Sequence, residues 1–121
     1  MKLHMVTIMV RSLENSIKFY QELVGLQMVN QINLERGQIV FLANKKEETV
    51  LELIAFKGEE TVQTKKLVMS YSADKPLEII RTKAFDLGYS PSAIIKEGMK
   101  PEHFTVQDPD VITVEFVGRK G

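Results

Sequence analysis

Two glutamates at equivalent points of the chain are the first residues that point to chemistry. Glu52 lies in the apolar stretch "TVLELIAF", and Glu115 lies in "VITVEF", 63 positions later. A buried carboxylate without a partner costs several kcal/mol or takes up a proton. Each glutamate therefore either lies on a half-exposed sheet face or has a function. Glu52 and Glu115 are therefore the candidate catalytic residues if the protein is an enzyme.

The composition narrows the chemistry further. The 121 residues include 16 basic and 16 acidic ones, so no net charge attracts nucleic acid. There is no cysteine, which excludes disulfides, thiolate metal sites and cysteine nucleophiles. The apolar run in "MKLHMVTIMV" is too short for a membrane span, and its alternation suits a strand. We expect a cytoplasmic protein whose partners include neither nucleic acid nor a membrane.

The elements that would position the glutamates follow a repeated order. The spacing of apolar residues in "SLENSIKFYQELVG" predicts a helix that Ser12 caps and Gly25 ends. A second helix, "DKPLEIIRTKAFDLG", is opened by Asp74 and Pro76 and closed by Gly88. Strands are predicted at about 3–10, 26–33, 38–43, 49–56, 67–73, 92–96, 102–107 and 111–117. The chain is thus a β-α-β-β-β unit written twice.

A fixed offset supports this duplication. Gly25 and Gly88 are 63 positions apart, as the two glutamates are, and the same offset aligns Phe41 with Phe104. We predict a single domain over residues 1–121. Its parts are a first module at about 1–57, a polar linker at about 58–66 and a second module at about 67–118.

Three stretches carry a resemblance to a known family. "MVTIMVRSLENSIKFYQELVGLQMV", the "LEL" strand and "FTVQDPDVITVEF" resemble, in type and order, the vicinal oxygen chelate superfamily. This superfamily includes glyoxalase I, extradiol dioxygenases, and bleomycin and fosfomycin resistance proteins. The resemblance covers nearly the whole chain. It implies an α+β fold in which two βαβββ modules form a partly open, curved-sheet barrel around a cavity, and it implies a homodimer.

The resemblance also implies four metal ligands, one on the first and one on the fourth strand of each module. Glu52 and Glu115 stand at the fourth-strand positions. The first-strand position lies eight residues before the leucine that opens the helix, which gives Met5, and the repeat offset then gives Val68. Neither suits a hard divalent cation, because valine has no ligand atom and a thioether is soft. We therefore expect no cofactor, with a divalent metal (Ni, Zn, Co, Mn or Mg) on Glu52 and Glu115 as the alternative.

The chain has two histidines, His4 and His103. His4 neighbours a first-strand ligand position but should point to the opposite strand face, so a surface role is favoured. His103 aligns with Val40 by the offset, and we keep it as a ligand-binding candidate at a strand end. The family's "DPDG" turn is here "DPDV". Because a β-branched Val111 tolerates a left-handed conformation poorly, we expect another turn type.

Strand alternation predicts which side chains share the cavity face with the glutamates. The ligand-binding candidates are Met5, Thr7, Met9, Val68, Ser70, Ser72 and Thr113, with His103. Two carboxylates in one cavity cannot both ionise at low cost without a metal. One of them should therefore hold a proton or be matched by a cation.

Three functions stay open at this point. The first is a divergent glyoxalase-family protein that binds a small organic ligand in the cavity between its two modules without a metal. The alternative is a metal-dependent glyoxalase I-like lyase or isomerase, or a dioxygenase, that uses a glutamate base. The third is an interaction module whose cavity is degenerate.

Overall fold

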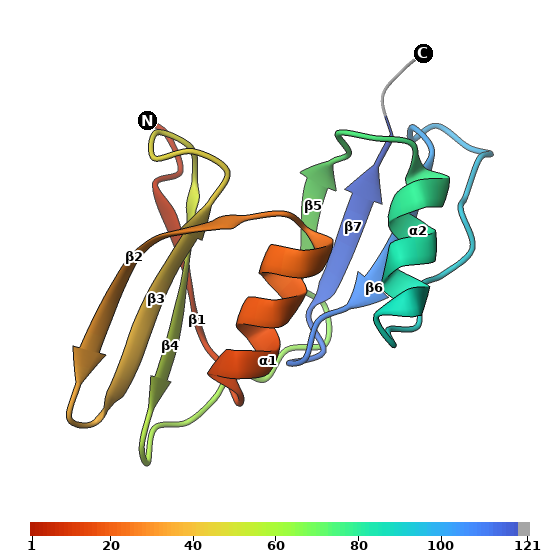
Figure 1. Ribbon diagram of the computed structural model, residues 1–121. Coiled ribbons are helices and arrows are strands. Elements are labelled where there is room, and N and C mark those ends of the chain that lie inside the picture. The colour runs from red at the N-terminus through yellow and green to blue at the C-terminus, as the bar shows by residue number, and fades with distance from the viewer. Residues whose placement is uncertain (119–121) are drawn as a thin grey trace. The chain divides into compact units, whose positions relative to one another are not determined.

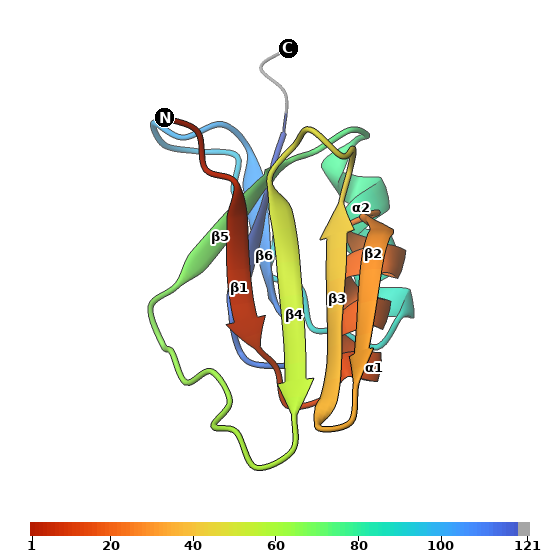
Figure 2. The same ribbon diagram turned by 90° about the vertical axis from the view of Figure 1, so that its left-hand side faces the viewer.

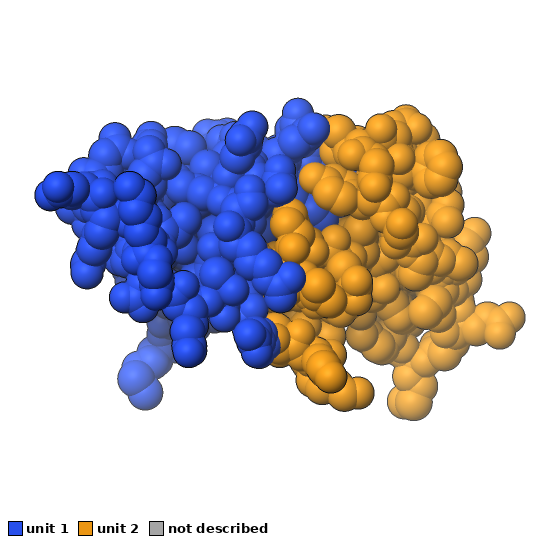
Figure 3. Space-filling model, turned by 90° about the horizontal axis from the view of Figure 1, so that it is seen from below, with its two compact units in different colours: residues 1–63 blue, residues 64–121 orange. Residues whose placement is uncertain are grey.

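The computed structural model describes residues 1–118. The chain divides into two compact units, unit 1 at Met1–Gln63 and unit 2 at Thr64–Gly121 (Figure 3). In each unit, helix packs against an open sheet, which confirms the predicted α+β fold class (Figure 1). That the two units act as one domain with a linker at about 58–66 stays a prediction.

Unit 1 is a four-stranded sheet with helix on one face. Its strands are β1 (Met5–Met9), β2 (Gln27–Leu34), β3 (Gly37–Ala43) and β4 (Val50–Phe56), in the order β1-β4-β3-β2. The helix α1 (Leu13–Lys18) runs on into a π-helical segment, η1 (Phe19–Leu23), and α1 packs against β4. The opposite face, turned toward the viewer in Figure 2, shows the four strands side by side with no helix in front of them.

The first helix begins and ends where the sequence predicts. The hydroxyl of Ser12 accepts the N–H of Asn15 at 3.2 Å, and Gly25 ends the helix at a φ of 87°. The π-helical turn is a feature that apolar spacing did not predict. In this turn Val24 N–H donates to the carbonyl of Phe19, five residues back, at 3.3 Å. The residues that the two helical segments bury are Ser16, Phe19, Tyr20 and Leu23.

Unit 2 repeats this plan with a smaller sheet. Its elements are β5 (Val68–Ser72), α2 (Leu77–Asp86), β6 (His103–Gln107) and β7 (Thr113–Val117), and the strand order is β5-β7-β6. The helix α2 packs against β6 and begins after Pro76, without the side-chain cap expected from Asp74. In its core the rings of Phe104 and Phe116 stack with centroids 5.2 Å apart.

The strand predicted at 92–96 is reduced to one bridge, between Ile95 and His103. Ser92 N–H does donate to Thr105 C=O at 2.8 Å, but the carbonyl of Ser92 accepts Arg81 Nε at 2.7 Å instead of a strand partner. The Ser92 hydroxyl takes the place of that carbonyl and accepts Thr105 N–H at 2.9 Å. Three residues of this segment then span two of β6, so the ladder is broken as in a β-bulge.

The repeat offset fails by one residue in β6. Glu52 lies opposite Phe41, whereas Glu115 lies opposite Thr105 and not opposite Phe104. The reason is the connection before the last strand, which has six residues (44–49) in unit 1 and five (108–112) in unit 2. A one-residue slip exchanges the faces of a strand. The alignment of Phe41 with Phe104 is therefore wrong in space.

The same slip corrects the alignment of His103 with Val40. His103 lies opposite Val117, on the face of β6 and β7 that carries Glu115, whereas Val40 is fully buried. His103 is therefore a neighbour of the Glu115 site and not a core residue.

The expected change of turn type at Val111 is wrong. Val111 has a φ of 67°, the left-handed conformation that a glycine would adopt. The turn is held by Asp108, whose Oδ1 accepts the N–H of Asp110 at 2.8 Å and that of Ile112 at 3.0 Å. These bonds stabilise the turn enough to carry a β-branched residue in an unfavourable conformation.

We predict that Val111→Gly stabilises the protein. A residue with a Cβ costs about 1–2 kcal/mol in the left-handed conformation. Glycine removes this cost but loses more conformational entropy on folding, so the free energy of unfolding should rise by about 1 kcal/mol. Urea denaturation measures this change. Val111→Ala is the control, because alanine keeps the left-handed penalty and should shift stability by less than about 0.5 kcal/mol. A loss of stability in Val111→Gly would contradict the strained turn.

A substitution at Gly37 tests how closely β3 approaches β4. A Cβ on this residue, whose φ is 150°, would lie 2.0 Å from the Ala55 carbonyl oxygen on the neighbouring strand. We expect Gly37→Ala to lower the free energy of unfolding by more than about 2 kcal/mol. Gly58→Ala is the matched control, with a φ of 79° and no atom within 4 Å, and should cost only about 1 kcal/mol. Equal losses in the two variants would argue against this close approach.

Candidate functional site

Each of the two glutamates accepts a hydrogen bond from a hydroxyl on the neighbouring parallel strand. The register places Thr7 beside Glu52 and Ser70 beside Glu115. Thr7 Oγ1 donates to Glu52 Oε1 at 2.5 Å, and Ser70 Oγ donates to Glu115 Oε1 at 2.6 Å. Thr7 and Ser70 are themselves 63 positions apart. The duplicated feature is thus a hydroxyl–carboxylate pair and not a lone acid.

Glu115 has a second partner that the repeat does not provide. Its Oε2 accepts a charged hydrogen bond from Lys100 Nζ at 2.6 Å. The Glu115 side chain is 7% exposed, whereas that of Lys100 is 60% exposed. The bond from Lys100, then that from Ser70, hold the pKa of Glu115 below its ordinary value against the opposing effect of burial. Glu115 is therefore an ionised carboxylate matched by a cation.

The predicted strand residues lie on the helix-free faces, as alternation required. In unit 1 Met5, Thr7 and Met9 pair with Val50, Glu52 and Ile54, and in unit 2 Val68, Ser70 and Ser72 pair with Thr113, Glu115 and Val117. His103 shares the unit 2 face, and its Nδ1 lies 2.8 Å from the Pro101 carbonyl oxygen. His4 precedes β1 and is exposed. Binding or catalysis by these residues stays a prediction.

The donor set does not fit the divalent metal of the family resemblance. At the two first-strand positions stand Met5, paired with Val50, and Val68, which is 51% exposed, and neither offers a hard ligand. Both oxygens of Glu115 already accept hydrogen bonds from this chain. Over residues 1–118 no group of three His, Cys, Asp or Glu side chains could hold a metal ion.

The helix-free faces of the two units differ in chemistry. Across unit 1 the register aligns Ile32, Ile39, Ile54 and Met9 in one row, and Asn30, Phe41, Glu52 and Thr7 in the next. Across unit 2 it aligns Thr105, Glu115 and Ser70 in one row, and Gln107, Thr113 and Val68 in the next. The unit 1 face is mostly apolar and the unit 2 face mostly polar.

Sequence reasoning missed three of the polar residues of unit 2. Lys100 belongs to an irregular charged segment, and no spacing relates it to Glu115. Thr105 and Gln107 were missed because the offset of 63, without the one-residue correction, assigns them to the opposite face of β6. The five-residue connection between β6 and β7 is the one signal that would have placed them on the Glu115 face.

The sequence and fold define the class of protein. The model of the Glyoxalase/Bleomycin resistance protein/Dioxygenase superfamily matches residues 2–116, and the chain belongs to that family. No curated protein matches the chain. Within the described residues no helix combines the length and the apolar character needed to cross a membrane.

Several solved structures share the fold. TnmS3, an antibiotic binding protein from Streptomyces sp. CB03234, is 17% identical with a TM-score of 0.78, and the match covers 99% of this chain and 97% of that one. The trypanothione-dependent glyoxalase I of Leishmania major is 21% identical with a TM-score of 0.80, over 98% and 86%. A glyoxalase family protein from Bacillus cereus is 15% identical with a TM-score of 0.82, over 100% and 95%. At these identities the likeness shows the fold alone.

We predict that Lys100→Met weakens the fold in a pH-dependent way. Because folding lowers the pKa of Glu115 from its ordinary value of 4.5, its contribution to stability is present above that value and is lost as pH falls through the folded pKa. At pH 7 the variant should lose about 1 kcal/mol, and this difference should shrink below about pH 4. Denaturation across pH measures the effect.

The control for this experiment is Lys96→Met. Lys96 Nζ lies 4.0 Å from Glu78 Oε1, and both side chains are more than half exposed, so its removal should change stability by less than about 0.5 kcal/mol. A difference between Lys100→Met and the unmodified protein that does not depend on pH would exclude Glu115 as the coupled group.

Proposed function

We propose that this chain binds a small organic molecule on the helix-free faces of its sheets, without a metal ion. The observation that carries the proposal is the 2.6 Å contact between Lys100 Nζ and Glu115 Oε2. It supplies from within the chain the positive charge that a metal would bring to this carboxylate. The antibiotic-binding function of TnmS3, which shares the fold, supports the same class of activity.

The unit 1 face supports the proposal through its apolar character. Ile32 and Leu34 are 39% and 44% exposed, and Ile39, Phe41 and Ile54 on the same face are half-buried. Small-molecule sites are mostly apolar with a few fixed polar groups. Glu52, with Thr7 as its donor, is such a group on this face.

A glyoxalase I-like lyase or isomerase is the second candidate, favoured by the presence of Glu52 and Glu115 at matching positions. A general base works best when its pKa lies near the working pH. The lowered pKa of Glu115 makes that carboxylate a poor base, so in this candidate Glu52 is the base.

An interaction module is the third candidate. In all three we expect a cytoplasmic homodimer, and the exposed apolar residues of β2 support self-association.

The proposal is tested by binding to EDTA-treated protein. We expect at least one compound of an antibiotic library that includes bleomycin to raise the melting temperature. The rise should correspond to about 2.7 kcal/mol at 100 times Kd and should be the same with and without EDTA. Phe41→Ala should weaken binding, whereas Thr82→Val, an exposed change on α2, should not.

Two results would contradict the proposal. One is the absence of any stabilising compound. The other is turnover of the hemithioacetal of methylglyoxal and glutathione that appears only when Ni²⁺ or Zn²⁺ is added and is lost in Glu52→Gln, which would favour the metal-dependent enzyme.

A further inference from the structure

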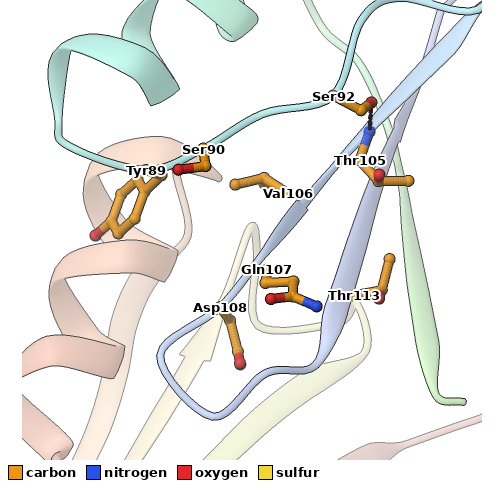
Figure 4. A pocket seen from close by; sticks show the side chains of 8 residues that line it. All are labelled: Tyr89, Ser90, Ser92, Thr105, Val106, Gln107, Asp108 and Thr113. Carbon is orange, nitrogen blue, oxygen red and sulfur yellow. Dashed lines mark hydrogen bonds between the residues drawn. The ribbon is translucent and has the colours of Figure 1, made fainter. Parts of the chain in front are cut away.

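Unit 2 contains a cavity of about 410 Å³ beside strand β6 (Figure 4). This volume lies within the range of about 300–1,000 Å³ that is typical of small-molecule sites. All the residues that line it belong to unit 2: Tyr89, Ser90, Ser92, Thr105, Val106, Gln107, Asp108 and Thr113.

The cavity opens because the pairing of β6 with the segment that follows α2 stops at Thr105. Ser92 holds that residue through its N–H and its hydroxyl, at 2.8 and 2.9 Å. Backbone groups two residues apart in a strand point to the same edge, so those of Gln107 point to the edge where Ser92 binds Thr105. No backbone hydrogen bond within the described chain joins Gln107 to residues 89–92. The cavity is thus built at an edge strand that lacks a partner along this stretch.

Most of the lining residues carry neutral polar groups, and the lining has little free charge. Five of the eight residues have hydroxyl groups, and Gln107 adds an amide. No Lys, Arg or His is among the lining residues, which disfavours phosphate or carboxylate ligands. The one carboxylate, Asp108, is buried and already accepts two backbone N–H groups of its own turn through Oδ1. The cavity therefore presents neutral groups that both donate and accept hydrogen bonds.

Three of these residues occupy neighbouring positions on one face of the sheet. Gln107 lies directly opposite Thr113, and Thr105 lies two residues before Gln107 on the same face. Such neighbours are separated by about 5 Å across the strands and about 7 Å along one strand. The side chains of these three residues make no hydrogen bond within the described part of the chain. Tyr89, next to Ser90, also lines the cavity (Figure 4).

We propose that this cavity binds a neutral polyhydroxylated molecule, such as a monosaccharide unit, through Thr105, Gln107 and Thr113. The inference rests on the proposed function and names the chemistry of one of its ligands. Hydroxyl groups of the ligand both donate and accept hydrogen bonds, and so match the hydroxyls of threonine and the amide of glutamine.

The test is titration of the isotope-labelled full chain, observed by the amide resonances of Thr105, Gln107 and Thr113. The probes are D-glucose, D-mannose, D-galactose and N-acetyl-D-glucosamine, with cyclohexanol and sodium acetate as probes that lack the hydroxyl array. We expect at least one sugar to shift these resonances with saturation. The double variant Thr105→Val, Thr113→Val should weaken that sugar about tenfold or more, because it removes two hydrogen bonds without changing side-chain shape.

The outcomes separate this inference from the proposed function. Thr82→Val serves as the control and should bind the sugar as the unmodified chain does. If no sugar shifts the three resonances while an antibiotic binds, the inference is overturned and the proposed function stands. If cyclohexanol or acetate shifts them as strongly as the sugars, the inference is also overturned. If no compound of either set binds, both proposals fail.

Discussion

The hydrogen bond between a hydroxyl on the first strand of each unit and a glutamate on its last strand depends on parallel pairing. Parallel neighbours need a long crossover connection, which here contains the helix and the intervening strands. When the last strand returns beside the first, register alone decides which side chains meet, and it brings Thr7 to Glu52 and Ser70 to Glu115. A shift of one residue would turn each glutamate into the core beneath the helix, at a cost of several kcal/mol.

The two units solve the problem of a half-buried acid differently. In unit 1 the hydroxyl of Thr7 is the donor found for Glu52, and the carboxylate stays partly exposed. In unit 2 the carboxylate is more deeply buried, and Lys100 enters as a charged second donor. Lys100 comes from the irregular segment that replaces the tight β2–β3 hairpin of unit 1. The loss of regular strand structure before β6 therefore gives Glu115 its cation.

Sequence patterns predicted the fold well because hydrophobic periodicity and chain reversals are local signals. The caps at Ser12 and Gly25 and seven of the eight expected strands could be read directly, as could the residues on the helix-free faces of β1 and β5. What failed depends on contacts that periodicity does not encode. The strand expected at 92–96 is interrupted because the Ser92 carbonyl accepts a hydrogen bond from Arg81. The ion pair at Glu115 depends on the path of the loop that carries Lys100.

The two faces of each sheet follow different constraints. Beneath the helices equivalent positions hold apolar residues in both units, Leu51 with Val114 and Leu53 with Phe116, because close packing tolerates little else. On the helix-free faces Met9 corresponds to Ser72, so polarity is free to change there. The hydroxyl–carboxylate pair is the exception on those faces. If either residue changed alone, the other would lose the hydrogen bond between them. The hydroxyl and the carboxylate therefore form a single unit on faces whose polarity otherwise differs between the two halves of the chain.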